Sequence, residues 1–250
     1  MTDAALETRG LGKRFGGLVA TDDVSFRLER GARHALIGPN GAGKTTFVNL
    51  LTGVLAPSAG RVLLGGEDIT GLRPEARVRR GLVRTFQINQ LFADLTPLET
   101  LAVAVSERLG HGDHWWHPIG GKTVAREVDH VAGRFGLGDV LDVRTDTLPY
   151  GKQRLLEIAV AFACAPRVLL LDEPAAGVPA AERQDILDAI AALPADVSVL
   201  LIEHDMDLVF SFAQRISVLV DGALLVEGTP AQIESDPRVR AVYLGEGSRG

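Results

Sequence analysis

The chain has 250 residues, of which 46% are hydrophobic, and its net charge is −6. This length can bury the core of one large domain, or of a domain with a smaller lobe. The acidic balance argues against nucleic acid as the main partner, because phosphate binding favours a basic surface. Cys164 is the only cysteine, which excludes an internal disulfide and is typical of a reducing compartment.

The first residues and the apolar runs bear on the relation of the chain to membranes. Met1-Thr2-Asp3 is polar and acidic, so we expect no secretory signal. The longest apolar runs, at residues 168–171 and 197–202, are far too short to cross a bilayer. We therefore expect a soluble chain that reaches a membrane only through partners.

The N-terminal part favours strands. Residues 6–28 predict two strands around a turn at Gly16-Gly17, with apolar and polar residues alternating at 24–28. Residues 60–66 predict a further strand and a tight turn. The arginine-rich residues from about 73 to 81 predict a solvated helix.

The remainder of the chain mixes helices and strands. Residues 95–141 have helical patterning, which predicts an α-helical lobe. The two apolar runs named above predict buried strands. The helix expected between them, at 180–193, implies parallel pairing with right-handed crossovers. A hairpin is expected at 216–226 around Asp221-Gly222, a favoured turn pair.

One segment matches the phosphate-binding pattern G-x-x-x-x-G-K-[ST]. Residues 34–37 before it predict a buried strand, and residues 47–51 after it carry apolar side chains at helical spacing. A strand, a glycine loop and a helix in this order aim backbone N–H groups at phosphates. Lys44 adds charge for the β- and γ-phosphates, and the Thr45 hydroxyl is a ligand for Mg²⁺. A turn that only caps a helix is the alternative, which the full pattern disfavours. The residues expected to bind a nucleoside triphosphate are Gly38, Pro39, Asn40, Gly41, Ala42, Gly43, Lys44, Thr45 and Thr46.

Two carboxylates follow the apolar run at 168–171. Asp172 and Glu173 are expected at the carboxyl edge of a sheet, where ligands bind in open α/β folds. There Asp172 can hold Mg²⁺ through water, and Glu173 can orient and deprotonate an attacking water. A solvated strand end that stops at Pro174 is the alternative, which the phosphate loop disfavours.

Two further polar residues are candidates for the same site. His204 follows the next strand at the same sheet edge, which favours a γ-phosphate contact over a purely structural role. Gln87, after Arg84-Thr85-Phe86, is compatible with a functional residue or with an ordinary loop residue.

The order of these motifs resembles that of the ATP-binding subunit of an ABC transporter, over nearly the whole chain. In that family's terms residues 38–46 resemble the Walker A loop, and Phe15 resembles the aromatic residue that stacks on adenine. Gln87 matches the Q-loop glutamine, which senses Mg²⁺ and the γ-phosphate and links to the membrane partner.

The same resemblance gives roles to the residues after the later strands. Asp172 resembles the Walker B aspartate, Glu173 the catalytic glutamate and His204 the switch histidine. It implies Glu173, His204 and Gln87 as catalytic residues, and Thr45, Gln87 and Asp172 around Mg²⁺.

Residues 148–154 lie where the family has its signature sequence. In the family, ATP is held between the Walker A loop of one cassette and the signature of another, so Pro149, Tyr150, Gly151 and Lys152 are expected to contact nucleotide. The usual signature has serine and glycine in place of Pro149 and Tyr150, and glutamine in place of Lys152. Pro179 stands where the family's D-loop has an acidic or amide residue. These departures lead to the hypothesis of slow or asymmetric hydrolysis.

A narrower resemblance is to subunits of branched-chain amino acid importers. Arg84-Thr85-Phe86-Gln87, Leu91-Phe92, Leu95-Thr96 and the tail at 227–245 carry it, although the tail is also compatible with a surface helix that caps the domain. Those importers use two different cassettes, two integral-membrane permease subunits and an extracytoplasmic substrate-binding protein. The resemblance implies ATP hydrolysis coupled to uptake of branched-chain or related amino acids, at the cytoplasmic face of the inner membrane.

The implied fold is an α/β P-loop NTPase with a mixed, largely parallel sheet core and an antiparallel N-terminal subdomain. We expect one ABC ATPase domain, with a RecA-like core at 1–88 and 166–250 and a helical subdomain at about 89–165. A non-transport ABC ATPase and a regulator that does not hydrolyse ATP remain alternatives. The chain has neither tandem cassettes nor a long coiled-coil insertion, which disfavours the first, and Glu173 with His204 disfavours the second.

His111, His114 and His117, with Trp115 and Trp116, fall outside the family's motifs. Metal binding is one interpretation, but the spacing is not that of a structural zinc site. We favour a loop whose tryptophans are buried or contact a membrane-side partner.

Overall fold

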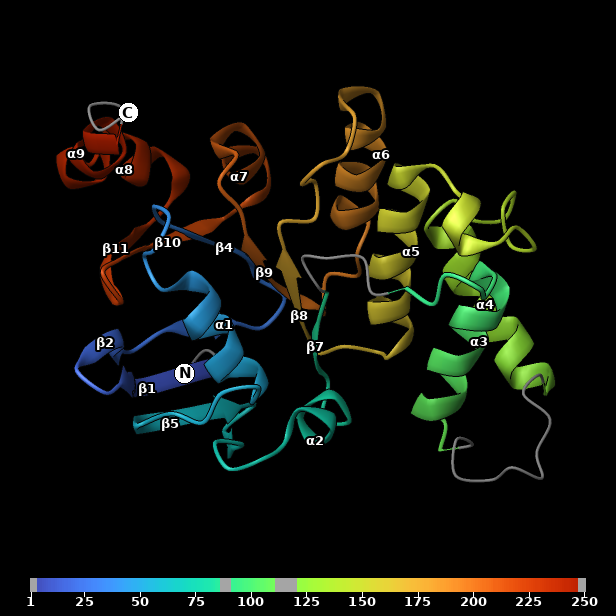
Figure 1. Ribbon diagram of the computed structural model, residues 1–250, viewed down its shortest axis with the longest axis horizontal. Coiled ribbons are helices and arrows are strands. Elements are labelled where there is room, and N and C mark those ends of the chain that lie inside the picture. Colours follow the sequence, from blue (N-terminus) through green and yellow to red (C-terminus); the bar gives the residue numbers. More distant parts are fainter. Residues whose placement is uncertain (1–3, 86–90, 111–120, 247–250) are drawn as a thin grey trace. The chain divides into compact units, whose positions relative to one another are not determined.

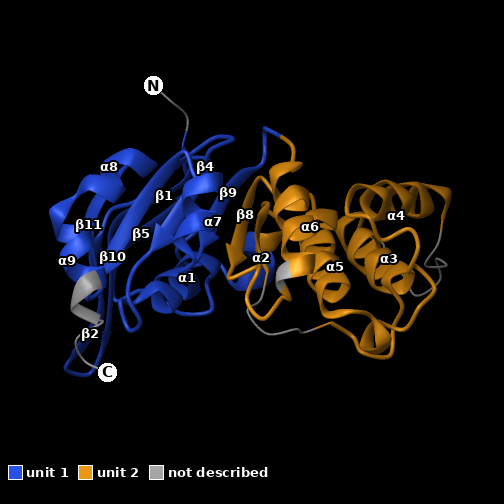
Figure 2. Cartoon of the chain, turned by 90° about the horizontal axis from the view of Figure 1, so that it is seen from above, with its two compact units in different colours: residues 1–77, 195–250 blue, residues 78–194 orange. Residues whose placement is uncertain are grey.

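The computed structural model describes residues 4–85, 91–110 and 121–246. They fall into two compact units, residues 1–77 with 195–250 and residues 78–194, which Figure 2 shows in different colours. The helical region predicted at about 89–165 lies within the second unit.

The first unit contains an antiparallel sheet in the order β2-β1-β5-β6 (Figure 1). Its strands are β1 (Ala4–Phe15), β2 (Leu18–Val24), β5 (Ala59–Leu64) and β6 (Glu67–Asp68), and β3 (Arg27–Glu29) pairs with the first half of β1. The strand and turn predicted at 60–66 are confirmed.

The two strands predicted around the turn at Gly16-Gly17 are confirmed, but the second strand ends at Val24 and the chain continues in the separate strand β3. The buried hydroxyl of Thr8 lies at the break, where it donates to the carbonyl of Val24 at 2.8 Å and accepts from the N–H of Phe26 at 3.0 Å. A side chain of β1 thus adds to the backbone hydrogen bonds between Thr8 and Phe26. The alternation survives, since Val24, Phe26 and Leu28 are all buried.

The first unit also contains the strands that carry the phosphate loop. β4 (Arg33–Ile37) pairs in parallel with β9 (Ser198–Ile202) on one side and with β10 (Arg215–Val220) on the other. β11 (Ala223–Gly228) returns antiparallel to β10. Asp221 and Gly222 form the turn with φ angles of 48° and 80°, which confirms the predicted hairpin.

The helices of this unit are α1 (Lys44–Thr52), α2 (Pro74–Val78), α7 (Met206–Phe212), α8 (Pro230–Ser235) and α9 (Pro237–Glu246). Ile233 of α8 and Val239 of α9 are buried in one cluster with Ile37 of β4 and Val218 of β10. The tail therefore packs against the sheet core, as expected for helices that cap the domain.

The solvated helix predicted at 73–81 is wrong in length and, at Arg77, in exposure. α2 has five residues, and Arg77 within it is only 1% exposed. Its guanidinium donates to the carbonyls of Leu50 and Leu51 at 2.8 and 2.6 Å, and to that of Thr70 at 2.7 Å. Because the last carbonyls of a helix lack partners within it, Arg77 acts as a cap for the end of α1.

Gly53, the C-cap of α1, makes room for this arginine. Its φ angle is 81°, and a Cβ atom there would lie 2.7 Å from Nε of Arg77. The glycine is therefore required for both its conformation and the close approach.

The second unit combines helices with a short parallel pair of strands. β7 (Leu82–Arg84) pairs with β8 (Val168–Asp172). The helices are α3 (Pro97–Arg108), α4 (Lys122–Arg134), α5 (Tyr150–Ala163) and α6 (Ala180–Ala191), with a 3₁₀ turn at Thr145–Thr147. α3, α4 and α5 lie side by side in Figures 1 and 2, which confirms the predicted helical lobe. In the parts of the chain that the structure describes, none of the helices has the length and apolar character needed to span a bilayer.

Candidate functional site

The glycine loop places backbone N–H groups at the start of α1. Gly43, its N-cap, has a φ angle of 95° and no side chain that could cap the helix. A Cβ atom on Gly43 would lie 2.6 Å from the carbonyl oxygen of Ala20, and one on Gly38 would lie 2.1 Å from that of Leu219. Both positions therefore require glycine, and the helix start is left for an anion.

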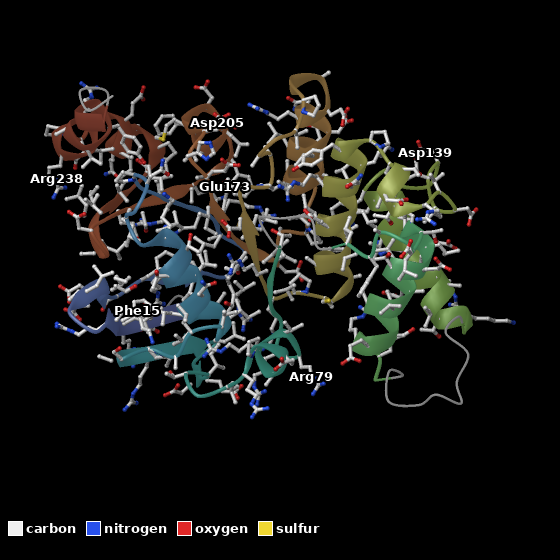
Figure 3. All side chains as sticks on the ribbon, in the orientation of Figure 1. Phe15, Arg79, Asp139, Glu173, Asp205 and Arg238 are labelled. Atoms are coloured by element: carbon white, nitrogen blue, oxygen red, sulfur yellow. The ribbon has the colours of Figure 1, made fainter. Side chains whose placement is uncertain are left out.

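Lys44 and Phe15 are two further residues of the first unit that the sequence predicts to contact nucleotide. The ammonium of Lys44 donates to the carbonyls of Gly38 and Pro39 at 2.5 and 3.0 Å, so it lies over the loop itself. Phe15 ends β1 and is 47% exposed, with Nζ of Lys13 5.0 Å from its ring centroid (Figure 3). An exposed aromatic face of this kind can stack on a base.

His204 lies at the same sheet edge as the loop. Leu36 of β4 is in register with Ile202 of β9, so Gly38 and Glu203 follow neighbouring parallel strands. The carboxylate of Glu203, 2% exposed, accepts from the N–H of His204 at 3.0 Å. This buried carboxylate fixes the turn, and the imidazole of His204 projects from it, 66% exposed.

Asp205 continues this turn into α7 (Figure 3). Its Oδ1 accepts from the N–H groups of Asp207 and Leu208 at 3.1 and 3.3 Å, which makes it the N-cap of the helix. The position of His204 is therefore set by carboxylates on both sides of it in the sequence. His204 is one of the residues predicted from the sequence, whereas the positioning role of Glu203 was not predicted.

In the second unit, Asp172 is the last residue of β8 and Glu173 follows it. Asp172 is 6% exposed, and its Oδ2 pairs with Nη2 of Arg84 at 2.5 Å. Glu173, labelled in Figure 3, has a φ angle of 47°. This left-handed conformation is rare outside glycine and typical of functional sites. The expected strand end with two carboxylates is confirmed.

The predicted signature residues lie at the start of α5. Pro149 is the N-cap and has no side-chain oxygen, and the N–H of Gly151 donates to Oε2 of Glu182 at 2.7 Å. The hydroxyl of Tyr150 donates to the carbonyl of Ala176 at 3.3 Å. The start of α5 is thus tied to the segment after Glu173 and to α6.

The side chain of Lys152 contacts the segment after α4. Its ammonium donates to the carbonyl of Gly136 at 2.6 Å and to Asp139 at 3.0 Å. This hydrogen bond holds the pKa of Asp139 below its ordinary value. The lysine therefore braces the segment after α4. Gln87 and the segment from His111 to His117 lie outside the described residues.

A family model described as ABC transporter matches residues 21–176, which is more than half of the chain. The chain belongs to the ABC transporter family. A second model, described as branched-chain amino acid ATP-binding cassette transporter, matches residues 223–248, the region of β11, α8 and α9.

Named relatives match over the full length. The high-affinity branched-chain amino acid transport ATP-binding protein BraF of Pseudomonas aeruginosa is 42% identical, over 98% of this chain and 100% of its own. LivG of Escherichia coli strain K12, with the same description, is 40% identical over the same shares of both chains.

Solved structures agree with this assignment. A crystal structure of a nucleotide-free ATP-binding cassette from an ABC transporter has a TM-score of 0.84 at 31% identity, covering 96% of this chain and 98% of that one. A cassette in its ADP conformation has a TM-score of 0.85 at 30% identity, covering 97% and 99%. The predicted family and fold, and the prediction of a nucleotide-binding ATPase subunit of a transporter, are confirmed.

Proposed function

We propose that this chain is the ATP-hydrolysing subunit of an importer for branched-chain or related amino acids. The match of the branched-chain model to residues 223–248 carries the proposal, because this tail is separate from the nucleotide motifs. The identity of 42% to BraF over nearly the whole chain supports it. The subunit sits peripherally on the cytoplasmic face of the cytoplasmic membrane and binds two integral-membrane permease subunits. An extracytoplasmic substrate-binding protein acts on it only indirectly.

The residues of the first unit hold the nucleotide. Gly38 to Thr46 bind the phosphates through the N–H groups at the start of α1 and the charge of Lys44. Phe15 stacks on adenine, and His204 contacts the γ-phosphate. The placement of Gly38 and Glu203 after neighbouring parallel strands supports this assignment.

The residues predicted around the metal have the side-chain chemistry that suits Mg²⁺. The Thr45 hydroxyl, the Asp172 carboxylate and the Gln87 side chain offer oxygen donors, which Mg²⁺ prefers. When bound with ATP, Mg²⁺ neutralises charge on the β- and γ-phosphates. Glu173 orients the attacking water and accepts its proton.

A second cassette completes the machinery. The residues at the start of α5, Pro149 to Lys152, contact the nucleotide held by a second copy or by a related subunit, and the N–H of Gly151 is the donor there. The whole chain acts as one ABC ATPase domain, with its core at 1–88 and 166–250 and its helical subdomain at about 89–165.

Purification of the tagged chain from its native membranes in mild detergent tests the assignment. We expect two multi-span permeases and a second cassette to co-purify with it. Recovery of the chain alone would contradict the transporter role. Turnover by wild type and E173Q tests the chemistry, and equal rates would contradict the role of Glu173.

A further inference from the structure

Arg84 and Asp172 form an ion pair that joins the ends of two strands. The register of β7 and β8 places Arg84 opposite Leu170, two residues before Asp172. The guanidinium Nη2 and the carboxylate Oδ2 are 2.5 Å apart, and the two side chains are only 12% and 8% exposed. The pair is therefore largely shielded from water, and both residues belong to the same compact unit.

The neighbouring residue Thr85 strengthens the connection. Its N–H donates to the carbonyl of Leu170 at 2.9 Å, and its hydroxyl accepts from the N–H of Asp172 at 3.3 Å. The end of β7 thus holds both the backbone and the side chain of Asp172. This double attachment limits the positions that the carboxylate can take.

A carboxylate in these surroundings needs a hydrogen-bonding partner. Asp172 follows Leu169, Leu170 and Leu171, which are fully buried, and burial of an unpaired charge is strongly unfavourable. A guanidinium is always protonated and binds a carboxylate oxygen in a fixed plane. One oxygen of Asp172 is thereby fixed, and the same contact sets the direction of the other.

We propose that Arg84 is a positioning residue for Mg²⁺-dependent nucleotide binding. It holds the Asp172 carboxylate in a fixed orientation, so that the second carboxylate oxygen serves the metal or its water. The inference rests on the proposed function, in which Asp172 acts on Mg²⁺. The contrary arrangement is that Arg84 merely competes with Mg²⁺ for the carboxylate, and the experiment separates the two.

The test measures nucleotide affinity of the purified full chain by calorimetry, in EDTA and in Mg²⁺. The Mg²⁺ enhancement is the ratio of the two affinities for ATP. We expect R84M to bind ATP in EDTA as wild type does and to lose at least tenfold of the enhancement. R84K keeps the charge but lacks the planar guanidinium, so it should lose less of the enhancement than R84M does.

Arg79 provides a matched control on the same segment. It pairs with Glu107 at 3.4 Å on the surface, 72% exposed, and Figure 3 labels it. R79M should therefore match wild type in both conditions. Thermal unfolding in EDTA verifies that the variants are folded, and R84Q replaces R84M if the latter does not fold.

The outcomes are distinct. An undiminished enhancement in R84M overturns the inference, and an increased one overturns it in favour of competition with Mg²⁺. Equal losses in R84M and R84K overturn the positioning role in favour of a general structural one. A wild type whose ATP affinity is independent of Mg²⁺ overturns the metal assignment of the proposed function itself, and this inference with it.

Discussion

The carboxylate of Glu182 accepts a hydrogen bond of 2.7 Å from the backbone N–H of Gly151. Glu182 lies in the first turn of α6 and Gly151 in the first turn of α5, two helices of one unit. A Cβ atom on Gly151 would lie 2.3 Å from Oε2 of Glu182, so this approach requires glycine. In the proposed function this N–H group donates to the phosphate of a nucleotide on a second cassette. In the structure it donates to a carboxylate of its own chain.

Glu182→Gln should therefore strengthen ATP-dependent pairing of cassettes. The variant replaces a charge-assisted hydrogen bond by a neutral one, a difference of about 1 kcal/mol. This corresponds to about fivefold tighter pairing. The measurement is the dimer fraction by analytical ultracentrifugation at increasing ATP, in an E173Q background that retains the nucleotide. D185N, on the exposed face of the same helix, is the control and should pair as its parent does. Unchanged or weaker pairing in E182Q would contradict this competition.

Arg77→Met should destabilise the chain strongly. The substitution removes the donors to the carbonyls of Leu50, Leu51, Thr70 and Leu72. Buried carbonyls without partners are costly, and we expect a loss of ~2–4 kcal/mol in the free energy of unfolding. Urea denaturation measures it. R79M, on the surface, should change the free energy by less than about 0.5 kcal/mol. A loss of less than about 0.5 kcal/mol in R77M would rule out the role of Arg77 as a cap for α1.

His34 should make the chain sensitive to mild acid. Its ring is 1% exposed, and Nε2 lies 2.8 Å from the hydroxyl of Ser217, which donates to Glu227. Burial lowers the pKa of His34 from 6.5 to about 4, against the attraction of Glu227, which raises it; Arg215 lowers it further. The folded chain therefore binds this proton less readily than the unfolded chain does.

The sign of the pH dependence follows from this difference. The contribution of neutral His34 to stability is fully present above pH 6.5 and is lost as the pH falls towards about 4. Between pH 7 and pH 5 we expect a loss of about 2 kcal/mol. Urea denaturation at pH 7, 6 and 5 measures the free energy of unfolding. H34Q should remove this part of its dependence on pH, whereas H130Q, at an exposed position, should keep it. Parallel curves for wild type and H34Q would refute the assignment.

Several features were predictable because neighbouring residues in the sequence decide them. The phosphate loop between β4 and α1 depends on glycines and a lysine within one short segment. The turn at Asp221-Gly222 follows from two residues that readily adopt positive φ angles. Asp172 and Glu173 were placed at a strand end by the apolar run before them. In each case consecutive residues determine the local backbone conformation.

Other features depended on contacts between distant parts of the chain. Arg77 was expected in solvent, but the open carbonyls at the end of α1 bury it. The break between β2 and β3 is bridged by the hydroxyl of Thr8, which lies on another strand. Glu182 meets Gly151 across 31 positions, and Arg84 meets Asp172 across 88. A charged side chain finds its partner only when the chain has folded, because the free energy of pairing depends on burial and distance, which the sequence does not state.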